Sequence, residues 1–180
     1  KPYYRYLHKA YGFVGVQWID PEGLTRQHLL GLEQIFIEPT LDSSEDPLNT
    51  IQYYLASKRE PLVLLGEVGM GKSTLLRYIA LTTVDRRQRL KWEISYKLPF
   101  YLSLGLDVFT DELVKNRELL LEEALEVAMN EKGWKARPGW IERKLEKGDC
   151  LVLLDGLDEV GDANIRQQVV TWIQRKLTSD

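Results

Sequence analysis

The sequence predicts an α/β fold in three layers, with a mostly parallel sheet preceded by a small helical and extended segment. Short apolar runs of strand type occupy 61–65, 98–104 and 150–155, and patterns typical of amphipathic helices separate them. Strands that alternate with helices are typical of a parallel sheet covered by helices. The 180 residues are enough for one domain with a sizeable core.

Composition and charge narrow the classes of partner. Hydrophobic residues make up 44% of the chain and charged residues 28%, as in soluble globular proteins. The 24 basic and 27 acidic residues leave a net charge of −3, which gives no reason to expect direct binding to nucleic acid or to an anionic membrane. With Cys150 as the only cysteine we expect no disulfide framework and a reducing, cytoplasmic location. No apolar run approaches the roughly 20 residues that span a bilayer.

Residues 1–46 are predicted to be a lead-in segment that packs on the core domain. Tyr4, Leu7 and Tyr11 fall on one face of a predicted helix. An extended, partly buried stretch then ends near Pro39, with apolar positions at Leu30, Leu32, Ile35 and Ile37.

The core domain is expected over 47–180. Asp46 is suited to an N-cap and Pro47 to the first position of a helix. The helix after the first core strand is predicted to run to about Val84, where it ends in a cluster of arginines and a lysine at 86–91. Cations at the end of a helix are common in solvent, so we do not interpret this cluster as a nucleic-acid contact. Further helices are predicted at 121–129, 140–147 and 165–177.

A glycine-rich loop joins the first core strand to the helix that follows it. Its sequence from 66 to 73 is Gly-Glu-Val-Gly-Met-Gly-Lys-Ser, which fits the Walker A pattern of a phosphate-binding loop. The glycines allow a tight turn whose N–H groups point inward, and the helix directs its positive end to the same place. Lys72 is predicted to reach the β- and γ-phosphates, and Ser73 to offer its hydroxyl to Mg²⁺.

A second motif follows about 80 residues later, where Leu-Val-Leu-Leu-Asp-Gly-Leu-Asp-Glu occupies 151–159. Asp155 ends a buried strand, as expected of a Walker B carboxylate that holds Mg²⁺ through water. Glu159 is placed to orient or deprotonate the attacking water, and Asp158 is the second candidate. Together the two motifs predict a P-loop NTPase fold.

The two motifs together resemble the NACHT family, which belongs to the STAND class of signal-transduction NTPases. In that family a small residue follows the metal-binding aspartate and two acids come shortly after, as Gly156, Asp158 and Glu159 do here. The resemblance extends to the strand at 98–102, the helix at 142–148, and the lead-in at 4–7 with 30–37, as in prokaryotic members.

The resemblance implies a role for each matching residue. Lys72, Glu159 and Asp158 would be catalytic, and Ser73 and Asp155 would bind Mg²⁺. The nucleotide-binding set would be Val68, Gly69, Met70, Gly71, Lys72, Ser73 and Thr74, with Ile37 and Pro39 as candidates for the base pocket. Members of the family act as switches related to those of innate immunity: an ADP-bound closed state opens on exchange for ATP and forms homo-oligomers, and hydrolysis is slow.

One family element is missing from this sequence. The family's next strand ends in an arginine that senses the γ-phosphate, and the chain stops at Asp180 before that strand. The strand belongs between those at 62–65 and 151–155, so we expect a fragment with a gap in its sheet. ATPase activity is expected of the full-length protein, whereas the fragment is expected to retain phosphate binding.

Two alternative functions remain open. The first is a P-loop NTPase of another family. A GTPase would carry Asn-Lys-x-Asp and a transporter ATPase a Leu-Ser-Gly-Gly-Gln signature; the chain has neither, and the cluster at 86–91 is a poor match to the arginine-rich lid of a small-molecule kinase. The second is a module that only holds nucleotide as a structural ligand.

Overall fold

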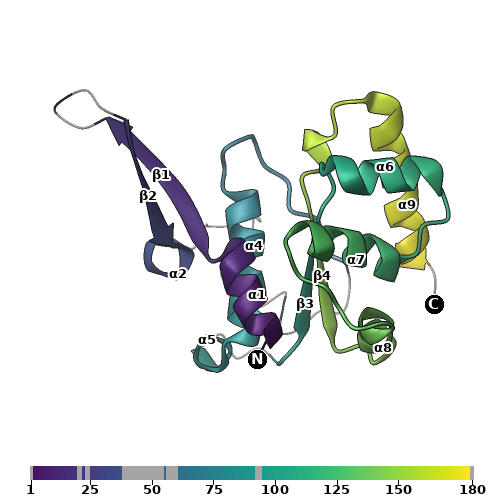
Figure 1. Ribbon diagram of the computed structural model, residues 1–180, viewed down its shortest axis with the longest axis horizontal. Helices are drawn as coiled ribbons and strands as arrows, with labels where there is room; N and C mark the ends of the chain where they lie inside the picture. The colour runs from purple at the N-terminus through teal and green to yellow at the C-terminus, as the bar shows by residue number, and fades with distance from the viewer. Residues whose placement is uncertain are drawn as a thin grey trace, which may run out of the picture. The chain divides into compact units, whose positions relative to one another are not determined.

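The computed structural model describes residues 2–19, 22, 25–37, 55, 61–91 and 95–178, and the chain divides into two units (Figure 1). The N-terminal unit comprises Lys1–Lys58 and Leu64–Ile94, and the C-terminal unit comprises Arg59–Val63 and Ser95–Asp180. Each unit is described by itself. Within the described residues, no helix has both the length and the apolar character needed to cross a membrane.

The N-terminal unit begins with α1 (Pro2–Tyr11), which packs against α4 (Lys72–Val84). The helix predicted here is confirmed, but Tyr3 and Tyr6 are buried whereas Tyr4 is half-buried. The reason is that buried positions three to four residues apart form one face, and this face contains Tyr3, Tyr6, Leu7 and Tyr11. Burial raises the pKa of Tyr6 and of Tyr11 above its ordinary value.

An antiparallel hairpin follows α1 and consists of β1 (Phe13–Ile19) and β2 (Thr25–Gly31), paired from Phe13↔Gly31 to Ile19↔Thr25 (Figure 1). The extended stretch predicted to reach Pro39 ends earlier, because Leu32–Ile35 forms the short helix α2. The N–H of Phe36 closes this turn on the carbonyl of Leu32, whose side chain is fully buried. Pro39 and the helix predicted from Pro47 lie outside the described residues.

The helix predicted after the glycine-rich loop is confirmed, since α4 ends at Val84 and α5 (Arg86–Lys91) follows after Asp85. The core strand predicted at 61–65 is wrong, because residues 61–67 form neither strand nor helix. Leu65 is 91% exposed and Val63 75%. A strand is stabilised by hydrogen bonds to a neighbouring strand, and within the described part of the chain this run is paired with none.

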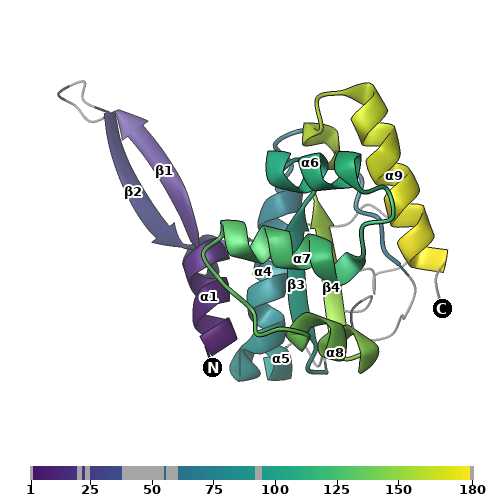
Figure 2. The same ribbon diagram turned by 45° about the vertical axis from the view of Figure 1, so that its right-hand side comes forward.

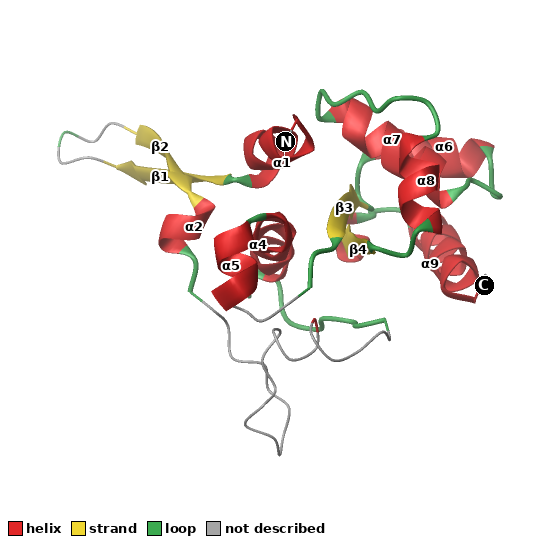
Figure 3. Ribbon diagram, turned by 90° about the horizontal axis from the view of Figure 1, so that it is seen from below, coloured by secondary structure: helices red, strands yellow, loops and turns green. Residues whose placement is uncertain are grey.

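The C-terminal unit is built on two parallel strands, β3 (Leu98–Ser103) and β4 (Cys150–Asp155), paired from Leu98↔Cys150 to Ser103↔Asp155. Both predicted strands and their parallel direction are confirmed. The α-helices of this unit lie on one side of the pair (Figures 2 and 3). They are α6 (Asp107–Lys115), α7 (Leu121–Glu131), α8 (Trp140–Glu146) and α9 (Ala163–Thr178). The described part of this unit is therefore an α/β arrangement with a two-stranded parallel sheet.

Most of the buried side chains of the C-terminal unit come from β3 and from the helices. Phe100 and Phe109 are fully buried. Trp172 of α9 packs its ring edge-on against Phe109, with ring centroids 5.3 Å apart, and donates a 2.8 Å hydrogen bond from Nε1 to the carbonyl of Leu119. In β4 only Leu153 is buried, so this strand is less covered than its apolar sequence predicts.

Candidate functional site

The glycine-rich loop has a backbone that only glycine adopts without strain at two positions. Gly69 has a φ of 85° and Gly71 a φ of 79°, both in the left-handed region that costs other residues about 1–2 kcal/mol. A Cβ added to either glycine would meet nothing within 4 Å. Backbone conformation, and not lack of space, therefore requires glycine at both positions.

Lys72 follows these glycines and closes the loop on itself. Its Nζ donates hydrogen bonds to the carbonyl of Gly66 at 2.7 Å and to that of Glu67 at 2.9 Å. Lys72 is the first residue of α4, so its side chain extends from the helix start back across the loop. A cation is held at the place where the loop turns into the helix.

The first turn of α4 adds backbone donors at the same place. Gly71 is its N-cap, and no side chain caps the helix. The first N–H groups of any α-helix have no partner within the helix, and its dipole is positive at this end. Ser73 and Thr74, both half-buried, stand in this turn. The loop, Lys72 and the helix start together form an arrangement suited to an anion.

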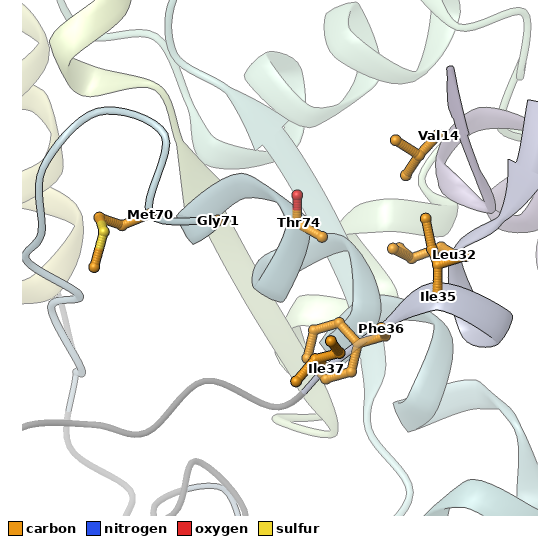
Figure 4. Close-up of a pocket in the computed structure, with 8 residues that line it drawn as sticks. All are labelled: Val14, Leu32, Ile35, Phe36, Ile37, Met70, Gly71 and Thr74. Atoms are coloured by element: carbon orange, nitrogen blue, oxygen red, sulfur yellow. The ribbon is translucent and has the colours of Figure 1, made fainter. Parts of the chain in front are cut away.

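An apolar pocket adjoins the helix start, with a volume of about 160 Å³ (Figure 4). Phe36 is one of its walls and stacks on Tyr78 of α4, with ring centroids 3.7 Å apart and an interplanar angle of 7°. Ile37 lies at the pocket although its side chain is 87% exposed. The lining residues are Val14, Leu32, Ile35, Phe36, Ile37, Met70, Gly71 and Thr74. Pro39, the other predicted base contact, lies outside the described residues.

The acidic motif lies at the end of β4, in the C-terminal unit. Asp155 is the last residue of the strand, and the hydroxyl of Tyr101 from β3 donates a hydrogen bond to its Oδ2. The carbonyl of Asp155 accepts a 2.7 Å hydrogen bond from the N–H of Leu104. β3 and the turn after it therefore hold both the side chain and the backbone of Asp155.

The predicted catalytic acids follow in a single 3-10 turn, η1 (Leu157–Glu159), which begins after Gly156 at a φ of 77°. Asp158 and Glu159 are both exposed. Glu159 lies against two glycines: a Cβ on Gly105 would be 2.8 Å from the Cβ of Glu159, and one on Gly156 would be 2.8 Å from its Oε2. Both glycines therefore leave the space that this side chain occupies.

The residues after η1 anchor the turn to α9. The carbonyl of Val160 accepts two hydrogen bonds from Arg166, from Nε at 2.9 Å and from Nη2 at 2.7 Å. Oδ1 of Asp162 caps the start of α9 by accepting from the N–H of Asn164 at 2.7 Å and from that of Ile165 at 3.0 Å.

The donor set fits a hard cation. Ser73 offers a hydroxyl oxygen and Asp155 a carboxylate oxygen, and Mg²⁺ prefers oxygen ligands and keeps several waters. Ser73 belongs to the N-terminal unit and Asp155 to the C-terminal unit.

Several residues of the site carry no signal in the sequence. Tyr101 hydrogen-bonds to Asp155, and Gly105 lies against Glu159. Phe36 lines the pocket with Ile37, and Arg166 hydrogen-bonds to Val160, the residue after Glu159. Neither the glycine-rich loop nor the acidic motif includes Tyr101, Gly105, Phe36 or Arg166, and strand register and turn geometry bring them to these positions. Of these residues, Phe36 could most nearly have been predicted from the sequence, because it is next to the predicted base contact Ile37.

Comparison with known proteins gives one match. A family model described as NACHT domain matches residues 60–179, about two thirds of the chain. The matched region contains the glycine-rich loop, both parallel strands and the acidic turn. No curated protein and no solved structure gives a significant match.

Proposed function

The chain belongs to the NACHT domain family, and we propose that it binds adenine nucleotide with Mg²⁺ and acts as a nucleotide-dependent signalling switch. In the full-length protein the switch is a slow ATPase that forms homo-oligomers in the ATP-bound state, in the cytoplasm. The observation that carries this proposal is the loop at 66–73, where two left-handed glycines and the ammonium group of Lys72 meet the uncapped start of α4.

The phosphates bind at this loop, along 68–74. The two carbonyls that now accept from Lys72 carry partial negative charge, and a phosphate oxygen with a full charge is the stronger acceptor. Nucleotide binding therefore transfers the Nζ donors of Lys72 from the loop to the β- and γ-phosphates. The N–H groups of the loop and of the first helical turn complete the cradle.

Mg²⁺ would be held by the hydroxyl of Ser73 and the carboxylate of Asp155, and it would neutralise charge on the phosphate oxygens. Glu159 orients the attacking water or accepts its proton, with Asp158 as the alternative. Support for Glu159 comes from its position against Gly105 and Gly156, because a base must be held within hydrogen-bond reach of its water.

The adenine base binds in the pocket beside the helix start. Its walls are mostly apolar, and Phe36 presents an aromatic ring backed by Tyr78, as suits a flat base. Ile37 contacts the same pocket, and Pro39 remains a proposed contact. Residues 1–46 thus form a lead-in that supplies the base pocket, and 47–180 the core domain.

A second candidate is a module that binds nucleotide without turnover. The observation that favours it is the absence of strand structure over 61–67, which leaves the phosphate loop without the supporting strand predicted before it.

Calorimetry on the Lys72→Ala variant tests phosphate binding. We expect no detectable ATP binding and an unchanged circular dichroism spectrum, because Lys72 supplies a charge to the phosphates and is not part of the core. Lys132→Ala, which removes an exposed lysine outside the site, is the matched control. Equal ATP affinity in both variants would contradict the assignment of the loop at 66–73 as the phosphate-binding site. In displacement of a fluorescent ATP, ATP should compete better than GTP, and equal competition would exclude adenine selectivity.

A further inference from the structure

We propose that Tyr101 is a positioning residue for the Mg²⁺-binding carboxylate of Asp155. The proposal rests on the function proposed above and adds a residue that belongs to neither motif. It follows from the register of the two strands, the burial of Tyr101 and the hydrogen bond between the two side chains.

The register explains why Tyr101 reaches Asp155. Tyr101 pairs with Leu153, and Ser103 pairs with Asp155. Residues two apart on a strand point to the same face of the sheet, and are separated by about 6.5 Å along it. Tyr101 and Asp155 are therefore diagonal neighbours on one face. The tyrosine hydroxyl bridges this separation, whereas the Ser103 directly beside Asp155 has a short side chain.

Burial makes this contact restrictive. Tyr101 is 5% exposed, and a buried hydroxyl without a partner is unfavourable. Donation to a carboxylate is charge-assisted and hence among the stronger hydrogen bonds in proteins. The contact therefore limits rotation of the Asp155 carboxylate about its Cβ–Cγ bond. An ionised carboxylate has about four acceptor positions, so donation to Oδ2 leaves capacity for a metal-bound water.

The turn after β3 also contacts Glu159, the acid proposed to act on the water. Gly105, in the turn after β3, leaves space for the Cβ of Glu159. β3 and its turn thus contact both acids of the site, Asp155 through Tyr101 and Glu159 through Gly105. A residue that hydrogen-bonds to a metal ligand fixes the orientation of that ligand. Removing such a residue lowers the metal affinity by about ten-fold or more.

The test is the Tyr101→Phe variant, which removes the hydroxyl and keeps the ring. The dissociation constant of a non-hydrolysable ATP analogue is measured in EDTA and across a Mg²⁺ titration. We expect the affinity in EDTA to be unchanged and the Mg²⁺ concentration for half-maximal tightening to rise about ten-fold. The control is Tyr6→Phe, which removes another buried tyrosine hydroxyl, one that is hydrogen-bonded to Tyr11. The control should keep the parental Mg²⁺ dependence.

Asp155→Asn and the double variant Tyr101→Phe/Asp155→Asn show whether the tyrosine acts through the carboxylate. If it does, the double variant has the same Mg²⁺ dependence as Asp155→Asn alone. A parental Mg²⁺ dependence in Tyr101→Phe overturns the proposal, as does a further ten-fold loss in the double variant. Failure of the parent to bind the analogue at all would instead refute the proposed function, so the two failures are distinguishable.

Discussion

Replacing Gly105 by alanine tests whether the turn after β3 holds Glu159 in place. The added Cβ would lie 2.8 Å from the Cβ of Glu159 and 3.2 Å from its Oε2. The second contact can be relieved by rotating the carboxylate, but the first cannot, because the Cβ is attached to the backbone. Optimal carbon–carbon contacts are about 3.5–4.0 Å, so the backbone of η1 or of the turn must move by about 1 Å.

The expected magnitudes follow from this displacement. Overpacking of this kind costs about 1–3 kcal/mol, and 1 kcal/mol lowers Tm by roughly 2–4 °C in a protein of this size. A misplacement of 1 Å in a catalytic constellation can cost about 100-fold in rate. We therefore expect Gly105→Ala to lower both Tm and ATP turnover in the full-length protein, with nucleotide affinity nearly unchanged because the phosphate loop is not altered.

Gly161→Ala is the matched control, since Gly161 lies two residues after Glu159, its φ is not positive, and a Cβ there would meet nothing within 4 Å. It should leave Tm and turnover near the parental values. A double variant provides the internal check: in a Glu159→Gly background both contacting atoms are absent, so adding Gly105→Ala should no longer lower Tm. Parental Tm and turnover in Gly105→Ala would show that Glu159 is not held by this turn, and the reasoning would be refuted.

Two further predictions concern the acidic turn and the last helix. In the full-length protein, Glu159→Gln should bind Mg-ATP as the parent does but hydrolyse it at least about ten-fold more slowly, because a group that acts on the water works mainly in the transition state. If Glu159→Gln keeps the parental turnover and Asp158→Asn loses it, the role belongs to Asp158. Trp172→Phe should lower the free energy of unfolding by about 1–3 kcal/mol, because the buried carbonyl of Leu119 loses its donor. A denaturant-unfolding midpoint equal to that of the parent would contradict this.

Local sequence was sufficient for the features that depend on neighbouring residues. The glycine spacing predicted the loop, whose Gly69 and Gly71 have the left-handed backbone that only glycine adopts freely. The apolar periodicity predicted α4, α7 and α9, and the two strands at 98–104 and 150–155 are present and parallel. The family resemblance stated from the paired motifs is confirmed by the match over 60–179.

Other predictions failed where the answer depends on partners distant in the chain. The run at 61–65 has strand composition, but a strand forms only with a neighbour to pair with, and local composition cannot supply one. The stretch after Gly31 turns into α2 because the N–H of Leu32 bonds to the carbonyl of Gly12 and its side chain is buried. Both outcomes are set by contacts between segments, which periodicity does not encode.

By itself, then, the sequence determined which functional groups the proposed site can use: a glycine-rich loop with Lys72, the hydroxyl of Ser73, and the carboxylates of Asp155 and Glu159. Tertiary structure alone decided how those residues are held. Tyr101 reaches Asp155 only because β3 and β4, distant in the sequence, pair in one particular register. Glu159 has its place only because the turn after β3 has a glycine beside it. The physical reason is that a motif records the backbone and functional groups of one segment, whereas orientation depends on packing between segments.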